Sequence, residues 1–297
     1  MKELFIPQPQ IQPQYQPERT EGLGKEQEIV QHPQALERAE QIIEDGRIQI
    51  DLFKDLYGAE VIAKDTAYVE KRKAQFSAND FRDTDHKILS ERSKIFEAML
   101  FQEGDGAMWF GEDSAIIMPS EYDDICNGVD SVVEIMRQEG LSTAALSIDL
   151  TFKRDIGSKV DSIANKVKQG VATKIKYYQS ELGDLRGEIS KVPHFVTGVN
   201  GRTLGELTNL FAERKSAQFA DHPVQFQIIE SIMLQAKTFA QVAESSGHGN
   251  LVKSYERIGR IFKEIYENRN EVVKDDGRRD SFFFSLQREL NILERSL

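Results

Sequence analysis

Side chains that can bind a cation or transfer a proton alternate with apolar ones along residues 144–153, near the middle of the chain. On an extended strand, the carboxylate of Asp149, the hydroxyl of Thr151 and the ammonium group of Lys153 share one face. The opposite face carries Leu146, Ile148, Leu150 and Phe152. An unpaired charge is costly to bury, so we expect the polar face to contact water, an opposite charge or a metal ion. This strand is the first candidate for a functional site.

A second candidate carboxylate, Asp130, follows the turn signal Asn127-Gly128. Residues 129–136 predict another strand, on which Asp130 and Glu134 share a face. Asp130 and Asp149 are either members of one site or ordinary structural and surface carboxylates. Their residue types alone leave both interpretations open.

The elements that must position these side chains divide the chain into four parts. Residues 1–33 are rich in Pro and Gln and lack the apolar side chains that would offset the entropy of ordering, so they predict a disordered tail. Helical spacing of apolar residues predicts a helical extension over 34–82. Residues 83–202 predict an α/β core, and 203–297 predict a C-terminal helical region.

Within the core, periodicity and turn signals predict a helix, then strands, a second helix and further strands. The predicted elements are a helix over 83–102, strands over 108–110, 115–118, 129–136 and 144–153, a helix opened by Gly157, and strands over 173–178 and 194–199. A polar loop is expected between the last two strands. Asp123 and Asp124 are interpreted as turn residues.

Composition restricts the class of protein. The 297 residues carry a formal net charge of −11, which favours solubility and gives no support to nucleic acid as a partner, although a local basic cleft is compatible with it. A single cysteine, Cys126, excludes an intrachain disulfide and indicates a reducing, cytoplasmic setting; we expect it to be a small buried side chain. No apolar run is long enough for a spanning helix, so no membrane association is expected.

The order helix, three strands, helix and strand resembles the PD-(D/E)XK nuclease-like fold. In that family an acidic residue near the start of the second strand and a (D/E)-x-K triplet on the third hold one or two Mg²⁺ ions. Asp130, in Asn-Gly-Val-Asp, matches the first position, and Asp149, in Ile-Asp-Leu-Thr-Phe-Lys, matches the second. Glu97, on the preceding helix, resembles an additional metal-associated glutamate of some members. The resemblance covers residues 83–200, and its motif is short.

The resemblance implies Mg²⁺ as the cofactor and phosphodiester hydrolysis as the reaction. A hard cation held by oxygen ligands lowers the pKa of a bound water, which attacks the phosphorus in line. The family's lysine orients that water or stabilises the developing charge. Thr151 occupies the lysine position here and supplies no charge. Lys153, on the same face, or Lys174 and Lys176 of the next strand are the candidates to replace it.

We therefore expect an α/β protein with a mixed central sheet of the PD-(D/E)XK nuclease-like type, flanked by helices and extended by helical segments at both ends. The leading hypothesis is a Mg²⁺-dependent nuclease-like phosphodiesterase. The alternative is a catalytically inactive nuclease-fold scaffold or protein-interaction module that binds a partner through its C-terminal helices. A purely helical interaction protein is excluded if strand 144–153 is central in a sheet. The pattern NGVD followed by DLTF also resembles an uncharacterised protein family of small-genome bacteria, which implies no activity.

Overall fold

The computed structural model describes residues 32–80, 84–136, 144–151 and 156–297. For a few of these, Asp149 and Thr151 among them, only the backbone is described. The tail expected over residues 1–33 therefore lies almost wholly outside the described residues, as does Lys153.

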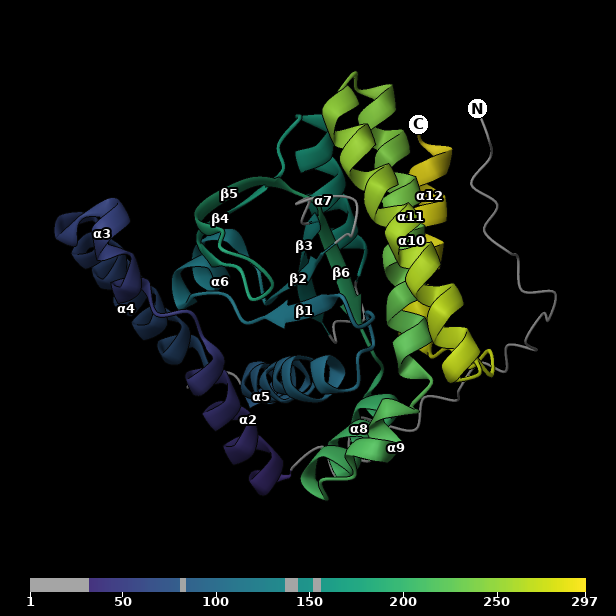
Figure 1. Cartoon of the computed structure of the whole chain (residues 1–297), viewed down its shortest axis with the longest axis horizontal. Helices are drawn as coiled ribbons and strands as arrows, with labels where there is room; N and C mark the ends of the chain where they lie inside the picture. Colours follow the sequence, from purple (N-terminus) through teal and green to yellow (C-terminus); the bar gives the residue numbers. More distant parts are fainter. Residues whose placement is uncertain (1–31, 81–83, 137–143, 152–155) are drawn as a thin grey trace.

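A four-stranded mixed sheet lies at the centre of the molecule (Figure 1). Its spatial order is β1-β2-β3-β6, in which β1, β2 and β3 are antiparallel neighbours and β6 runs parallel to β3. The strands are β1 Ser114–Ile117, β2 Ser131–Ile135, β3 Ala144–Thr151 and β6 His194–Gly198. The predicted α/β class and the interior position of β3 are confirmed, so a purely helical protein is excluded.

One face of this sheet is covered by a two-stranded hairpin. Its strands are β4 Thr173–Gln179 and β5 Arg186–Val192, which pair antiparallel with two irregularities in register. Ile175, Tyr178 and Val192 of the hairpin join Ile117 and Val132 of the sheet in one apolar cluster. Helices cover the face opposite the hairpin. Both faces of the sheet are therefore buried over this region.

The opposite face of the sheet packs against helices in the main hydrophobic core. Apolar side chains of β2 and β3 contribute Val133, Leu146, Ile148 and Leu150 to this core. The covering helices include α5 Thr84–Met99, which continues into a π-helical turn Leu100–Gly104, and α7 Gly157–Lys168. Val160, Ile163, Ala164 and Val167 form the buried stripe of α7, at the spacing that the sequence predicts.

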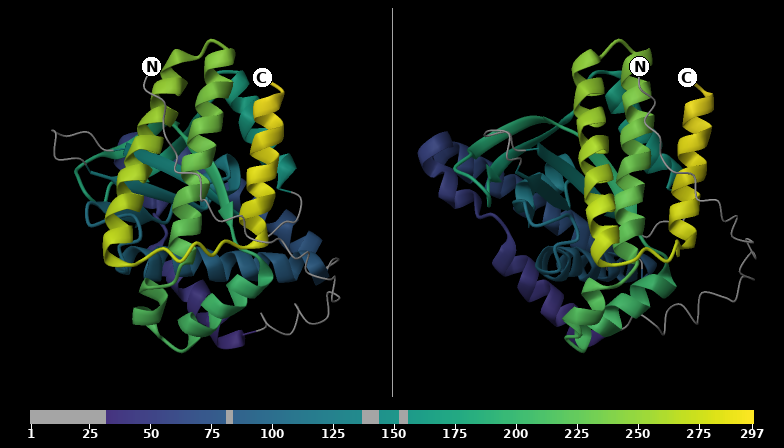
Figure 2. Two further views of the ribbon diagram at one scale, coloured as in Figure 1. Left: turned by 90° about the vertical axis from the view of Figure 1, so that its right-hand side faces the viewer. Right: turned by 45° about the vertical axis from the view of Figure 1, so that its right-hand side comes forward.

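The C-terminal helices are α8 Gly201–Ala212, α9 Ser216–Ala220, α10 Val224–Ser245, α11 Gly249–Val272 and α12 Ser281–Arg295 (Figure 2). Of these, α10 packs along β6 at the edge of the sheet, and α11 and α12 pack on α10. Gln235 of α10 accepts the Val196 N–H at 3.0 Å and donates to the Val196 carbonyl at 2.8 Å. This side-chain amide satisfies backbone groups that an edge strand would otherwise leave unpaired.

The N-terminal helices form the opposite flank of the molecule (Figure 1). They are α2 Pro33–Gly46, the 3₁₀ turn η1 Ile50–Phe53, α3 Lys54–Tyr57 and α4 Ala59–Asp80. Helix α2 packs on α5, and α4 packs on α6 Glu121–Asn127. No helix within the described residues is both long and apolar enough to cross a membrane.

Four local predictions are wrong. Residues 108–110 form a turn instead of a strand, with Met108 at φ 55°, and the polar loop before β6 contains β5. The expected turn at Asp123 and Asp124 is the helix α6, which Ser120 caps by accepting the Asp123 N–H. Cys126, expected to be buried, is exposed on that short helix.

Candidate functional site

Asp130 lies directly beside the Asp149 backbone. The N–H of Asp130 donates to the Ile148 carbonyl at 3.1 Å, and its carboxylate Oδ2 accepts the Leu150 N–H at 2.6 Å. These two bonds reach β3 on either side of Asp149. Asp149 and Thr151 continue the same strand and pair with Val196 and Gly198 of β6. Asp130 and Asp149 are thus neighbours in the backbone, while the side chain of Asp149 is not described.

Glu97 reaches the sheet region from α5 and is buried, with 8% of its surface exposed. Its nearest cation is Arg47, whose Nη2 lies 3.8 Å from Glu97 Oε1 and 2.6 Å from Asp124 Oδ2. Oε1 makes no hydrogen bond with the described residues. Burial and the neighbouring Asp124 carboxylate raise the pKa of Glu97, and Arg47 only partly offsets them. A buried carboxylate with an unsatisfied oxygen is unusual and points to a missing partner.

The Glu97–Arg47 pair lies beside the end of β1 that adjoins the start of β2. The Ile48 N–H, next to Arg47, donates to the carbonyl of Met118 at the end of β1. Ile117 of β1 pairs with Val132 of β2, so Met118 adjoins the start of β2, where Asp130 lies. The polar groups at this end therefore come from α5, the start of β2, the end of β3 and Arg47.

The side chains that the structure describes do not by themselves make a complete metal site. Among them, no three His, Cys, Asp or Glu side chains gather closely enough to hold an ion. Glu97 and Asp130 are two carboxylates of the predicted set, and Asp149 is the third. The donor set fits a hard cation such as Mg²⁺ in chemistry, because all three are carboxylates.

Lys174 and Lys176, two candidates for the missing motif lysine, are engaged elsewhere. Lys174 Nζ lies 3.0 Å from the Glu188 carboxylate on the outer face of the hairpin. Lys176 forms an ion pair with Asp65 of α4 and lies over the rings of Tyr57, Tyr122 and Tyr177 at 5.1–5.5 Å. This aromatic box ties the N-terminal helices to β4.

Asp123 is a buried anchor that the sequence interpretation missed. Its side chain is fully buried. It accepts hydrogen bonds from the Asn127 amide at 2.7 Å, from the Ser120 hydroxyl at 2.8 Å, and from the backbone N–H groups of Lys176 and Tyr177 at 2.7 and 2.9 Å. The carboxylate therefore pairs the free edge of β4 and fixes the hairpin on α6.

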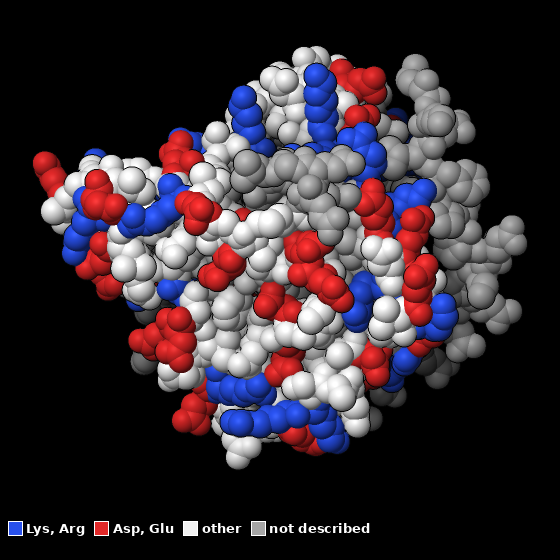
Figure 3. Space-filling view, in the orientation of Figure 1, with Lys and Arg blue, Asp and Glu red and all other residues white. Residues whose placement is uncertain are grey.

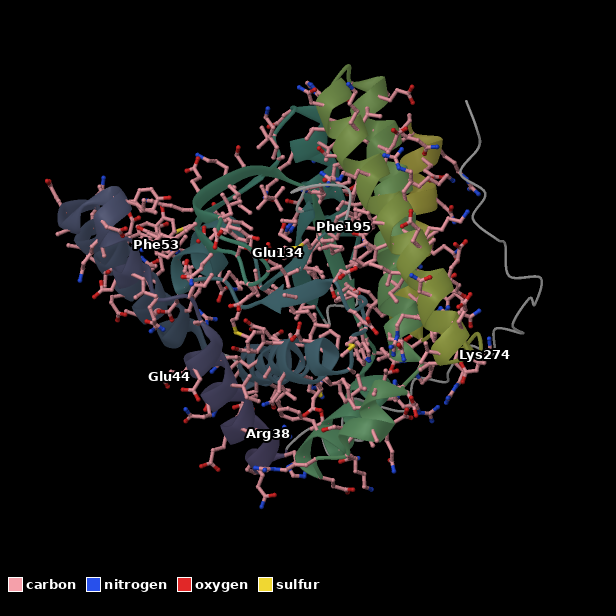
Figure 4. The ribbon with its side chains drawn as sticks, in the orientation of Figure 1. Arg38, Glu44, Phe53, Glu134, Phe195 and Lys274 are labelled. Carbon is pink, nitrogen blue, oxygen red and sulfur yellow. The ribbon has the colours of Figure 1, made fainter. Side chains whose placement is uncertain are left out.

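Glu134 anchors the other end of the hairpin. Figure 4 shows this residue between the sheet and the hairpin. Its carboxylate accepts the Ser180 hydroxyl at 2.5 Å and the N–H groups of Glu181 and Leu182 at 2.9 and 3.3 Å. A glutamate inside the apolar strand Ser131–Ile135 was a detectable signal, since such a side chain must find donors if both faces are buried.

The polar face of β3 is described at Ser147, whereas the side chains of Asp149, Thr151 and Lys153, on which the expectation rests, are not described. Ser147 is fully buried, and its hydroxyl lies 2.7 Å from Nδ1 of His194 on β6. The hairpin covers this face, and a contact within the protein satisfies the Ser147 hydroxyl.

Comparison with known proteins gives no relative: no family model, no curated protein and no solved structure matches the chain.

Proposed function

We propose that the chain is a divalent-cation-dependent phosphodiesterase of the PD-(D/E)XK nuclease-like type. The order of elements supports this. Helix α5 precedes three antiparallel strands, with the short helix α6 between the first two; α7 follows, and β6 returns parallel to β3 at the edge of the sheet. The β4–β5 hairpin is then an insertion between α7 and β6.

One observation carries the proposal: Asp130 holds β3 by hydrogen bonds on both sides of Asp149. A family motif spread over two strands requires this juxtaposition, which the sequence spacing alone does not provide. Glu97 adds a buried, incompletely satisfied carboxylate at the same end of the sheet. Asp130, Asp149 and Glu97 would hold Mg²⁺, which would supply Lewis-acid stabilisation and an activated water.

The lysine of the family triplet has one remaining candidate. Thr151 carries no charge, and Lys174 and Lys176 are already paired. Lys153, two residues beyond Thr151, is the lysine that we assign to stabilising charge on the phosphate. Thr151 would orient the attacking water through its hydroxyl.

The substrate class follows from the proposed chemistry, with nucleic acid as the phosphodiester. The charge of the surface gives limited electrostatic support to the binding of nucleic acid. Figure 3 shows acidic side chains over the middle of one face, with Lys and Arg gathered toward its upper and lower edges. A strongly acidic protein binds polyanions weakly unless a cation bridges them, so we expect binding to depend on the metal.

A specific observation favours a second candidate, an inactive nuclease-fold scaffold. Arg47 already supplies positive charge between Glu97 and Asp124, and a guanidinium there can replace a metal ion electrostatically. In that case the fold would position its C-terminal helices for a protein partner.

Metal titration distinguishes the two candidates without an assay of activity. A cation that binds the native state adds RT ln(1 + [L]/Kd) to stability, so millimolar Mg²⁺ or Mn²⁺ should raise the melting temperature in a saturable way. Asp149→Asn and Asp130→Asn should abolish that rise. Asp184→Asn, an exposed acidic residue in the β4–β5 turn, is the matched control and should leave it unchanged.

Cleavage of DNA and RNA by the same proteins completes the test. Wild type should cleave with Mg²⁺ or Mn²⁺, Asp149→Asn should not, and Thr151→Lys should raise the rate by restoring the triplet. No calorimetric metal binding by the wild type together with no cleavage would refute the phosphodiesterase and leave the scaffold.

A further inference from the structure

The segment that follows α2 forms an arm along one flank of the molecule. This N-terminal arm, residues 47–80, comprises the connector 47–49 and then η1, α3 and α4 (Figure 1). Its buried apolar side chains, among those described, are Phe53, Ile62 and Val69, and the first two belong to a cluster separate from the main core. Helix α2 instead contributes to the main core. The arm and α2 are thus held by different contacts, although they are continuous in sequence.

Apolar burial holds the arm weakly. Its large exposed apolar side chains outnumber its buried ones and are Leu52, Leu56, Val61, Tyr68 and Phe76. Helix α4 is 22 residues long, yet the buried side chains described on it are Ile62, Asp65 and Val69. A segment with few buried apolar contacts opens at a lower free energy than the core. We therefore expect the arm to detach more readily than the rest of the protein unfolds.

Charged contacts attach the arm to the body. Asp65 of α4 forms an ion pair with Lys176 of β4 and accepts the Tyr177 hydroxyl at 2.7 Å. Further along α4, Lys73 Nζ lies 3.0 Å from Glu121 Oε1 of α6. Hydrogen bonds between charged groups are stronger than neutral ones, so the loss of one charge weakens the attachment without disturbing the main core.

Arg47, the first residue of the arm, lies in the candidate site. Its Nη2 donates to Asp124 Oδ2 at 2.6 Å and lies 3.8 Å from Glu97 Oε1, too far for a hydrogen bond. Both Glu97 Oε1 and Arg47 Nε are buried without a hydrogen-bond partner among the described residues. The guanidinium thus places positive charge beside a proposed metal ligand but satisfies that ligand incompletely. A cation that binds Glu97 directly would remove the cost of its unsatisfied oxygen.

We infer that the arm is an autoinhibitory latch: docked, it holds Arg47 in competition with the metal ion for Glu97, and detached, it withdraws Arg47. Arg47 moves with the arm because α2 ends at Gly46. The inference rests on the proposed function, since Glu97 is one of the carboxylates assigned to the metal. Metal affinity should then depend on contacts of the arm that touch no ligand, such as the pair of Asp65 with Lys176.

Calorimetric titration of the full chain with Mn²⁺ tests the latch. Arg47→Gln removes the competing charge and should tighten binding about tenfold, since the apparent Kd varies inversely with the fraction of binding-competent molecules. Lys176→Met breaks the ion pair with Asp65 and should tighten binding about threefold by raising that fraction. The double variant should bind no more tightly than Arg47→Gln alone, because the arm acts through Arg47.

Two matched variants control for lost stability. Lys174→Met changes the other lysine of β4, which pairs with Glu188 of the hairpin, and should leave the affinity within about twofold of wild type. Arg38→Gln removes an arginine of α2 that lies 2.8 Å from Glu103, and it should not tighten binding even if it lowers the melting temperature. Lys176→Met decides the question if Arg47→Gln does not fold.

Hydrogen exchange gives a readout that needs no metal. Amides of α4 should exchange faster in Lys176→Met than in wild type, whereas those of α10 should not change. Coupling between two equilibria is reciprocal, so added Mn²⁺ should also speed exchange in α4 of the wild type. Unchanged exchange of α4 in both measurements would show that the arm does not detach and would overturn the latch.

The titration separates failure of the latch from failure of the proposed function. No gain in affinity in Arg47→Gln, with wild type still binding Mn²⁺ through Asp149, would overturn the latch alone. A gain in Arg47→Gln that persists after Asp149→Asn would keep Arg47 as the competitor but place the ion away from β3, against the phosphodiesterase. Additive gains in Arg47→Gln and Lys176→Met would show that the arm acts independently of Arg47, which also overturns the latch. No binding of Mn²⁺ by any of these proteins would refute both.

Discussion

Three buried carboxylates differ in how many donors their neighbours supply. Asp123 accepts four hydrogen bonds and Glu134 accepts three, so each is satisfied within the protein. Glu97 has Arg47 at 3.8 Å and leaves Oε1 without a hydrogen bond among the described residues. Satisfied carboxylates hold a fold together, whereas an unsatisfied one is available to a ligand. This contrast is why we place Glu97 in the candidate site and the other two outside it.

His222 gives a residue-level prediction about pH. Its Nδ1 accepts the Val224 N–H at 3.2 Å at the start of α10, which requires a neutral ring. Burial lowers the pKa of His222; Arg278 acts in the same direction, and Glu206, 3.8 Å from Nε2, opposes them. An unfolded His titrates near pH 6.5. The unfolded chain therefore binds more protons than the folded one below that pH, and stability is lost as pH falls through about 6.5 toward the folded pKa.

Urea unfolding at pH 7.5 and pH 5.5 measures this loss. The wild type should be less stable at pH 5.5, and His222→Gln should lose less between the two pH values, because the amide does not titrate. Equal losses in the two proteins would mean that His222 contributes nothing to the pH dependence.

At the scale of elements, the hairpin is the part that sequence periodicity fails to define. Alternation predicts strand β4, whereas β5 falls in the segment for which the sequence predicts a polar loop. Its outer face carries Arg186, Glu188 and Lys191, and its register is irregular, so the pattern lacks a clean period of two. Pairing with β4 and the two anchoring carboxylates determine this strand, and these are long-range contacts that no local pattern reveals.

Glu134→Ala should detach one end of the hairpin. The change leaves the Ser180 hydroxyl and two N–H groups without their charged acceptor, so we expect a loss of roughly 3 kcal/mol in unfolding free energy. Amide exchange at Glu181 and Leu182 should quicken. Glu188→Ala, an exposed glutamate of the same hairpin, should stay within about 0.5 kcal/mol of wild type. Similar losses in the two variants would contradict the anchoring role of Glu134.

At the scale of the whole molecule, the sequence predicts the elements better than their environment. The apolar stripe of α7 and the alternation of β3 have the periods of a helix and a strand, and these predictions are confirmed. Alternation separates two faces but does not say what covers each. The proximity of Asp130 to Asp149 could be predicted from a resemblance, whereas Arg47 beside Glu97 could not, because it comes from a different part of the chain.

The burial of both sheet faces changes the energetics expected for β3. Ile148→Ala should cost roughly 2–5 kcal/mol through lost burial and a residual cavity. If the polar face were open to water, Ser147→Ala would be nearly neutral. Because the hairpin and β6 enclose Ser147, its removal leaves His194 Nδ1 without this partner in a buried position, and we expect a loss of about 1–3 kcal/mol.

Denaturant unfolding of three variants decides between the two descriptions of that face. Ser190→Ala, an exposed serine of β5, is the control and should lie within about 0.5 kcal/mol of wild type. A loss at Ser147 clearly above that of Ser190, and below that of Ile148, is the outcome expected of a sheet buried on both sides. A Ser147→Ala variant as stable as Ser190→Ala would show that the hairpin leaves the polar face open to water.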